Sequence, residues 1–146
     1  MRLLAIETST EACSVAVMVD GEGRERFEVA PLRHAELVLP WADALLAEAG
    51  ARRSALDAIA VGRGPGAFTG VRLGISIAQG IALALDRPLL PVSTLAVLAL
   101  GGAREDGPPV LAAIDARMGE VYAAAFAREG AGLRALSDEV VVPPDA

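Results

Sequence analysis

The stretch Leu4-Ala-Ile-Glu7 (LAIE) is a short apolar run that ends in an acid, and it returns 108 residues later as Ala112-Ala-Ile-Asp115 (AAID). In both copies a turn follows the acid, and then come an apolar strand-like segment, a glycine-containing turn and a third strand-like segment. This order predicts a duplicated β-β-β-α-β-α-β-α unit whose second copy stops after its third strand. A strand meander that leads into alternating helices and strands predicts an α/β fold with mixed sheets.

The first copy carries the clearest helical patterns. Apolar spacing predicts a helix from His34 to Gly50, which Pro40 kinks or opens with a tight first turn, and a second helix over Phe68–Leu85. The other expected elements are strands over Arg2–Glu7, Cys13–Val19, Arg24–Ala30, Asp57–Val61 and Leu89–Val92, a helix over Thr94–Ala103, and two later strands over Glu120–Ala127 and Leu133–Val141. We expect a first half over residues 1–104, a linker over residues 105–109, and the start of a second half over residues 110–146.

The composition limits the possible chemistry. All 13 basic residues are arginine, so mechanisms that need a lysine are excluded. The net charge of −6 makes the chain a poor RNA binder by itself, because binding nucleic acid requires neutralising phosphates. Cys13 is the single cysteine, and we expect a buried thiol without a disulfide. We also expect a cytoplasmic protein, because Glu7 interrupts the N-terminal apolar run too early for a signal peptide and the apolar run Leu73–Leu85 is too short to span a membrane.

Gly62-Arg-Gly-Pro-Gly-Ala-Phe-Thr-Gly70 (GRGPGAFTG) lies between a predicted strand and the second helix, where glycines often bind phosphate. A P-loop requires a lysine, which is missing. The spacing Gly62-x-Gly64-x-x-Ala67 fits a dinucleotide-binding loop, but Asp86 lies at the wrong end of the next strand to bind a ribose, and Pro65 removes a backbone donor. A tight strand-to-helix turn is the better interpretation.

Small residues recur every four positions along the second helix and form a smooth ridge. Gly74 and Gly80 each cost about 1 kcal/mol relative to alanine in a helix interior, so close approach of a neighbour must compensate for them. The ridge consists of Gly66, Gly70, Gly74, Ala78 and Ala82. It faces either the chain's own sheet or third helix, or a partner protein, and the spacing does not decide between them.

The turn Glu7-Thr8-Ser9-Thr10 is a second candidate site. An acid followed by three hydroxyls can hold a magnesium-bound phosphate, with Asp115 as its counterpart in the second copy. The same hydroxyls can equally close a hairpin, and the bulky residues Arg117 and Met118 after Asp115 disfavour phosphate binding. His34, the only histidine, is expected to be structural, because no cluster of metal ligands accompanies it.

Five segments together resemble the TsaB (YeaZ) family: Ile6–Thr10, Arg33–His34 leading into Leu39–Pro40, Gly62–Gly74, Pro91–Leu95 and Ala113–Tyr122. The resemblance covers nearly all of the chain, in order. It implies the duplicated ribonuclease-H-like fold of the acetate kinase/Hsp70/actin (ASKHA) superfamily. It also implies a non-catalytic partner of TsaD, which, with TsaB and the ATPase TsaE, transfers a threonylcarbamoyl group to an adenosine beside the tRNA anticodon. Chains of this family generally run longer and complete the second half.

The resemblance and the ridge together predict a scaffold or activator subunit that binds TsaD-like and TsaE-like proteins and reaches tRNA only through the complex. The expected partner interface consists of His34, Leu37, Trp41, Gly70, Gly74, Ala78 and Ala82, and the chain alone is expected to form a homodimer through this surface. We expect no metal and no cofactor in the isolated chain, ATP or ADP only at the interface of the complex, and a vestigial phosphate turn at Glu7, Thr8, Ser9, Thr10 and Asp115. The alternatives are an ATP-dependent phosphotransferase, with Glu7 and Asp115 flanking the nucleotide, and a glycoprotease-like peptidase.

Overall fold

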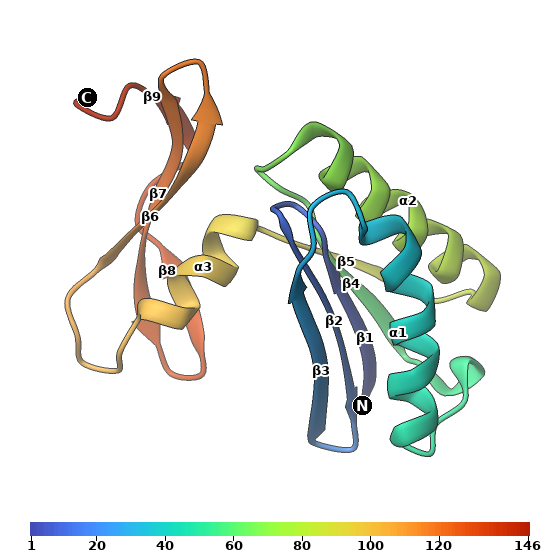
Figure 1. Cartoon of the computed structure of the whole chain (residues 1–146). Helices are drawn as coiled ribbons and strands as arrows, with labels where there is room; N and C mark the ends of the chain where they lie inside the picture. Colours follow the sequence, from blue (N-terminus) through green and yellow to red (C-terminus); the bar gives the residue numbers. More distant parts are fainter. The chain divides into compact units, whose positions relative to one another are not determined.

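The computed structural model describes residues 1–146, and their contacts divide them into two compact units. The first unit contains residues 1–63 and 67–92, and the second contains residues 64–66 and 93–146 (Figure 1). Each unit is built on its own β-sheet. The two sheets begin with the two copies of the repeated stretch, which confirms the predicted duplication.

The first sheet is mixed and has the strand order β3-β2-β1-β4-β5. Its antiparallel part is a meander of β1, β2 and β3, and β4 and β5 continue the sheet parallel to β1. The strands are β1 (Arg2–Glu7), β2 (Ala12–Val19), β3 (Glu22–Val29), β4 (Ala58–Gly62) and β5 (Leu89–Val92). A meander followed by parallel strands is the arrangement expected for a ribonuclease-H-like half, so this fold prediction is confirmed.

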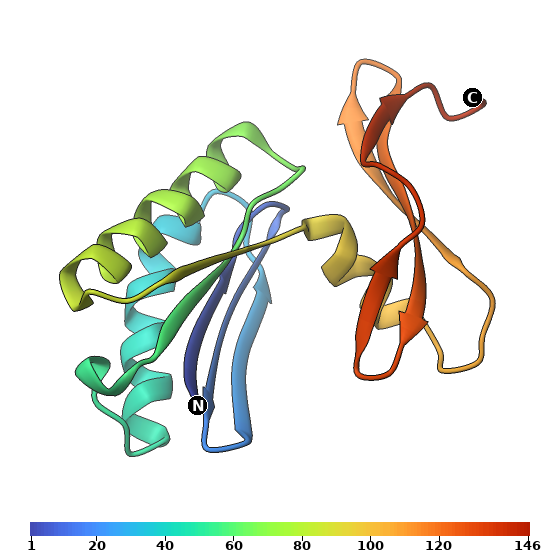
Figure 2. The same ribbon diagram turned by 180° about the vertical axis from the view of Figure 1, so that it is seen from behind.

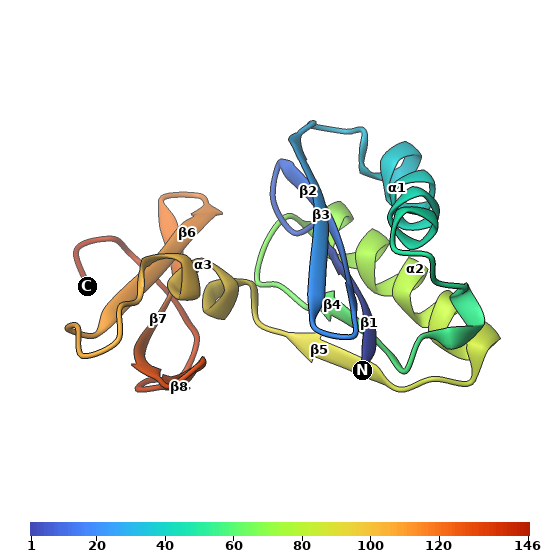
Figure 3. The same cartoon turned by 90° about the horizontal axis from the view of Figure 1, so that it is seen from below.

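The helices α1 (His34–Glu48) and α2 (Phe68–Leu85) lie side by side on one face of this sheet (Figures 1 and 3). α1 runs through Pro40, and a short 3-10 turn, η1 (Arg53–Ala55), precedes β4. Because side chains alternate along a strand, one face of the sheet carries the apolar residues that meet both helices. The buried core contains Leu4, Ile6, Val15 and Val17 from the strands, Val38 and Leu45 from α1, and Ala78 and Ala82 from α2.

The second sheet consists of β6 (Val110–Arg117), β7 (Glu120–Glu129), β8 (Gly132–Ala135) and β9 (Val140–Val142). β8 and β9 pair with different parts of β7, so the single strand predicted over Leu133–Val141 is in fact two strands. The chain leaves the sheet between them. There the backbone N–H of Ala125 in β7 donates to the Ser137 hydroxyl, at 3.0 Å.

The third helix, α3 (Thr94–Gly102), follows β5 (Figure 2). Leu95 and Ala99 of α3 are buried with Ala112, Ala124 and Phe126 of the second sheet. The predicted boundary at residue 104 assigned this helix to the first half, whereas its contacts place it in the second unit. The helix is so uniformly apolar that its pattern does not indicate which sheet it covers.

By length and composition alone, α2 is able to cross a membrane: it has 18 residues and a mean hydropathy of 1.5. A single such helix is weak evidence, because the core helix of a globular protein meets the same test. The apolar run counted in the sequence starts after Arg72, whereas α2 starts before it, at Phe68. The absence of a membrane span therefore stays a prediction.

Candidate functional site

The turn between β1 and β2 is held from within the first unit. Thr8 and Ser9 are only 2% and 1% exposed. The Thr8 hydroxyl donates to the backbone carbonyl of Gly70 at 2.7 Å, and the backbone N–H of Ala67 donates to the carbonyl of Ser9 at 2.8 Å. The Glu7 carboxylate accepts the backbone N–H of Ser9 at 2.7 Å. The Thr8 hydroxyl and the Ser9 carbonyl are thus hydrogen-bonded to the start of α2, and the Glu7 carboxylate is hydrogen-bonded within the turn. These are residues of the turn that the sequence suggested for phosphate binding.

The glycines of the GRGPGAFTG loop allow this turn to approach. A Cβ atom on Gly62 would lie well under 3.0 Å from the Glu7 carboxylate, and one on Gly70 would lie equally close to the carbonyl oxygen of Thr8. Cβ atoms essentially never come so near to other heavy atoms. Gly70 therefore requires glycine, because a backbone atom of the turn packs against it, whereas at Gly62 the end of the Glu7 side chain could move aside. The close packing at Gly70 supports the interpretation as a tight strand-to-helix turn.

His34 connects the start of α1 to the same turn. Its Nε2 lies 2.9 Å from the carbonyl oxygen of Thr10 and 3.2 Å from that of Ala12. Both partners are acceptors, so we assign the proton to Nε2, which donates to them. The side chain is buried, in agreement with the expected structural role. The β1–β2 turn is therefore bonded to the N-terminal ends of both helices.

The second copy of the turn uses its acid in the same way. The Asp115 carboxylate accepts the backbone N–H of Arg117, two residues ahead, at 2.7 Å, just as Glu7 accepts that of Ser9. Arg117 and Met118 adopt positive φ angles of 68° and 53°. The two acids share a turn-closing role, and Asp115 belongs to the second unit.

The residues predicted for a partner interface lie mostly inside the first unit. His34, Gly74, Ala78 and Ala82 are buried, and Leu37 and Trp41 are half-buried against the core. Gly70 meets the turn, and a Cβ on Gly74 would lie 2.5 Å from the Thr8 hydroxyl oxygen. The ridge on α2 therefore packs on the chain's own sheet, which was one of its two interpretations. A partner cannot use this edge without opening the core.

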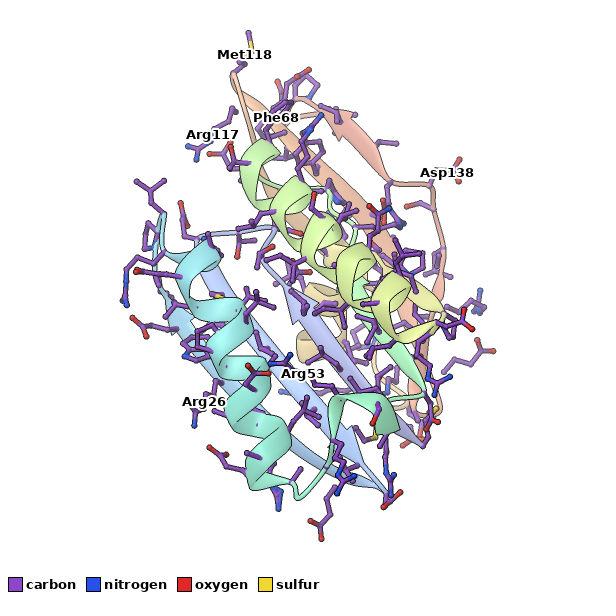
Figure 4. All side chains as sticks on the ribbon, turned by 90° about the vertical axis from the view of Figure 1, so that its right-hand side faces the viewer. Arg26, Arg53, Phe68, Arg117, Met118 and Asp138 are labelled. Atoms are coloured by element: carbon purple, nitrogen blue, oxygen red, sulfur yellow. The ribbon has the colours of Figure 1, made fainter.

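The opposite edge of α2 also carries small residues, but it is exposed. Ser76, Gly80 and Ala84 follow each other at intervals of four, and nothing lies within 4 Å of a Cβ built on Gly80. We call these three residues the outer edge of α2. At the start of the helix the Arg72 guanidinium lies over the exposed Phe68 ring, 3.4 Å from its centroid, and Figure 4 labels Phe68 there.

A groove of about 160 Å³ is lined by residues of α1 and by Ile81 of α2, which follows Gly80 in the chain. Its lining is mainly apolar and comes from α1, α2, β1 and the η1 segment before β4: Leu4, Leu39, Ala42, Asp43, Leu46, Arg53, Leu56 and Ile81. At the rim Arg53 forms a bidentate ion pair with Asp43, with N–O distances of 2.8 and 2.5 Å; Arg53 is labelled in Figure 4. The groove and the outer edge of α2 together form a smooth, partly apolar surface on which a helix of another protein can pack.

Comparisons with known proteins identify the family of the chain. A family model described as TsaD, tRNA N6-adenosine threonylcarbamoyltransferase, matches residues 28–146. The tRNA threonylcarbamoyladenosine biosynthesis protein TsaB of Escherichia coli (strain K12) is 48% identical over 99% of this chain and 64% of its own length. The protein of the same name in Haemophilus influenzae is 47% identical over 88% of this chain and 55% of its own length.

A solved structure described as YeaZ from Pseudomonas aeruginosa is 53% identical to the chain. It superposes with a TM-score of 0.93 over 98% of this chain and 68% of that structure. The chain thus spans less than two thirds of the length of the two curated relatives. Its similarity extends over both units.

Proposed function

The chain belongs to the TsaB (YeaZ) family, and on that premise we propose that it is a non-catalytic scaffold or activator subunit for a TsaD-like partner. In this proposal the complex, with a TsaE-like protein, forms threonylcarbamoyladenosine next to the tRNA anticodon. The chain works in the cytoplasm and contacts tRNA through its partners, because its net charge of −6 does not favour direct phosphate contacts.

The exposed glycine in the middle of α2 carries the proposal. No group of the chain occupies the space that a side chain at position 80 would fill, so nothing inside the chain explains why this residue is glycine. Glycine in a helix interior costs about 1 kcal/mol relative to alanine. Flanking Ser76 and Ala84 extend the same smooth strip. A partner helix that packs closely on this strip supplies the missing compensation. The proposed interface is therefore the outer edge of α2 with the adjacent groove, in place of the buried ridge.

The β1–β2 turn supports a structural role for the first unit. Thr8 and Ser9 are bonded to α2, and the Glu7 carboxylate closes its own turn. Binding a phosphate there would require these bonds to break and a negative charge to move aside. We propose that ATP or ADP, if part of the cycle, binds at the interface of the complex and not in the isolated chain.

The test is reconstitution with the TsaD-like and TsaE-like proteins. Gly80→Leu adds a large side chain to the outer edge of α2, and we expect it to weaken association with the TsaD-like protein about ten-fold or more, as for a central interface residue. Threonylcarbamoylation of tRNA should fall accordingly. Light scattering after gel filtration measures the complex, and labelled threonine incorporated into tRNA measures the product.

Gly101→Leu is the matched control. Gly101 is also an exposed glycine in a helix with open space around it, but it lies in α3. This variant should bind the partner like the wild type, and both variants should keep the wild-type circular dichroism. Equal binding by Gly80→Leu and wild type would refute the proposed interface. A reaction that proceeds equally well without the chain would refute the proposed function.

A further inference from the structure

The edge strand β3 carries exposed apolar side chains beside free backbone groups. β3 is the first strand in the sheet order, so one of its sides has no neighbouring strand (Figure 1). Phe27 and Val29 on this strand are 63% and 64% exposed. Natural sheets normally protect such an edge, because it can pair with a further strand. Large apolar side chains at an open edge therefore indicate that another strand binds there.

The register of the β2–β3 hairpin identifies the free backbone groups. Val19 pairs with Glu22 across the two-residue turn, and beyond the strands the N–H of Ala30 donates to the carbonyl of Glu11 at 3.0 Å. In an antiparallel pair the hydrogen-bonded residues alternate, so the even-numbered residues of β3 bond to β2. The N–H and C=O groups of the odd-numbered residues therefore point away from the sheet. These residues are Gly23, Glu25, Phe27 and Val29.

The odd-numbered side chains of β3 share the face of the sheet that the helices do not cover. Arg26 pairs with the buried Val15 of β2 and forms an ion pair with Glu48 of α1, so the even-numbered side chains face the helices (Figure 4 labels Arg26). Side chains alternate along a strand, so the odd-numbered ones lie together on the other face. We call three of them the edge row: Glu25, Phe27 and Val29.

Glu25 is the charged residue of β3 that has no ion pair. The Glu25 carboxylate accepts the hydroxyl of Ser14 at 2.7 Å, and no cation of the chain lies against it. The other charged residues of the strand form ion pairs within the chain: Glu22, Arg24, Arg26 and Glu28. Opposite charges at directly facing positions stabilise a sheet, so a lysine or arginine on an added strand complements Glu25.

A leucine extends the apolar surface just beyond β3. Pro31 and Leu32 are the central residues of a turn that the N–H of Arg33 closes by donating to the carbonyl of Ala30 at 3.1 Å. Leu32 has a φ angle of 66° and is 99% exposed. A turn with a positive φ at this position normally has glycine or asparagine there. The leucine has almost no contact within the chain, so we explain it by contact with another protein.

The opposite edge of the sheet is protected. β5 spans only Leu89–Val92 and includes Pro91, which has no N–H to donate. β3 is twice as long, with eight residues, and contains no proline. A strand that joins this sheet should therefore add to β3.

We propose that β3 binds an extended segment of another protein as an added antiparallel strand, with the sequence pattern apolar–polar–apolar–polar–basic. The two apolar residues lie opposite Val29 and Phe27, and the basic residue lies opposite Glu25. The backbone groups of the edge row supply the hydrogen bonds, and its side chains select the partner.

The same chemistry distinguishes this partner from β3 of a second copy. In an antiparallel pair of two β3 strands, only the outward-pointing, odd-numbered residues can form the hydrogen-bonded pairs, and none of them is basic. No register of that pair therefore sets a cation opposite Glu25. The edge row is on β3, whereas the outer edge of α2 is on the helix, and the inference goes beyond the proposed function.

Three synthetic peptides provide the test. The probe is a fluorescein-labelled peptide of sequence Thr-Val-Thr-Phe-Thr-Lys-Thr, whose valine, phenylalanine and lysine follow the proposed pattern. Fluorescence anisotropy should show saturable binding to the chain with a Kd of about 1 mM or lower. A peptide with glutamate in place of the lysine should bind about five-fold more weakly, because it sets like charges opposite each other. A peptide N-methylated at the phenylalanine lacks a strand hydrogen bond and should bind more weakly by about five-fold or more.

Variants of the chain show whether the peptide lies on the edge row. Glu25→Lys should reverse the preference, so that the glutamate peptide binds more tightly than the lysine peptide. Phe27→Asp should weaken the binding of both. Glu105→Lys is the matched control, because it makes the same charge change at an exposed residue between α3 and β6, and it should keep the wild-type preference. All three variants should keep the wild-type circular dichroism.

Several results would overturn the proposal: no binding of the lysine peptide to the wild type, an unchanged preference in Glu25→Lys, or full binding of the N-methylated peptide. A changed oligomeric state of Glu25→Lys in sedimentation equilibrium, with peptide binding unchanged, would also overturn it and would assign the edge to a second copy. Gly80→Leu should bind the peptide like the wild type, and Glu25→Lys should bind the TsaD-like protein like the wild type. This proposal and the proposed function therefore fail separately.

Discussion

The two small-residue edges of α2 have similar sequences and opposite surroundings. On the inner edge Gly70, Gly74, Ala78 and Ala82 face the sheet and the β1–β2 turn, and Ala78 is fully buried. On the outer edge Ser76, Gly80 and Ala84 are exposed. Small residues at intervals of four indicate that something approaches closely. They do not indicate whether it belongs to the same chain.

The two glycines in the middle of the helix show the difference most clearly. Gly74 leaves room for the Thr8 hydroxyl, so the helix-propensity cost of this glycine is offset inside the protein. Gly80 leaves room for nothing in the chain. The small residues of the inner edge are therefore explained by packing inside the chain. We explain those of the outer edge by the proposed partner. Substitutions of the glycines on the two edges should therefore change the free energy of unfolding in opposite directions and by different amounts.

The largest effect is expected for Gly70→Ala. The added methyl group would meet the carbonyl oxygen of Thr8, a backbone atom that cannot rotate away. The turn or the start of α2 must then move, and the Thr8 bond to the Gly70 carbonyl is strained. We expect the free energy of unfolding to fall by about 3 kcal/mol, measured by urea denaturation. Ser76→Ala, on the outer edge, should change it by less than about 0.5 kcal/mol; equal losses in the two variants would contradict the assignment of the edges.

A smaller effect of opposite sign is expected for Gly80→Ala. The methyl group enters open space on a helix, so the variant should gain the helix propensity of alanine, about 1 kcal/mol in the free energy of unfolding. Gly74→Ala is the matched comparison, because the same methyl group there lies 2.5 Å from the Thr8 hydroxyl oxygen. It should destabilise the protein. Thermal unfolding of the two variants side by side is sufficient, and a destabilised Gly80→Ala would show that this edge is packed.

Much of the fold could be predicted because the pattern is local. The repeated LAIE and AAID stretches, the tight turns and the apolar spacing of α1 and α2 indicated a duplicated mixed α/β fold and most element boundaries. The placement of α3 could not be predicted, because a short helix that is apolar on all sides packs equally well on either sheet. The third strand of the second sheet was predicted as one piece, although the polar run Ser137-Asp-Glu139 interrupts the apolar pattern where the chain leaves the sheet.

The site was predicted less well, for a related reason. The spacing of Gly70, Gly74, Ala78 and Ala82 revealed the ridge but not its direction, and its assignment to a partner surface does not fit its burial in the structure. A usable signal was present in the polar residues of α2, which fall on one strip of the helix: Thr69, Arg72, Ser76 and Gln79. That strip marks the solvent side, and Gly80 and Ala84 continue it. Polar residues are thus better indicators of direction than small ones.

The smallest effect concerns the buried thiol beneath the helices. Cys13 on β2 is fully buried, and burial, with a smaller contribution from the Glu28 charge, raises the pKa of its thiol above the ordinary value of 9.0. The folded state therefore holds this proton more tightly than the unfolded state. Stability is undiminished below pH 9.0 and falls as the pH rises through this value toward the folded pKa. Cys13→Ala should remove this part of the alkaline loss, measured by urea denaturation between neutral pH and pH 10.

The same thiol can report on both edges of α2 at once. Only the thiolate reacts with a disulfide reagent, so Cys13 should react only when the unit opens, and its rate should follow the equilibrium population of the open state. Gly70→Ala should then accelerate the reaction, and Gly80→Ala should slow it by about five-fold for a gain of about 1 kcal/mol. If Cys13 reacted equally fast in both variants, the thiol would be exposed by a local motion of β2 that α2 does not control. The two edges would then have to be compared by global unfolding alone.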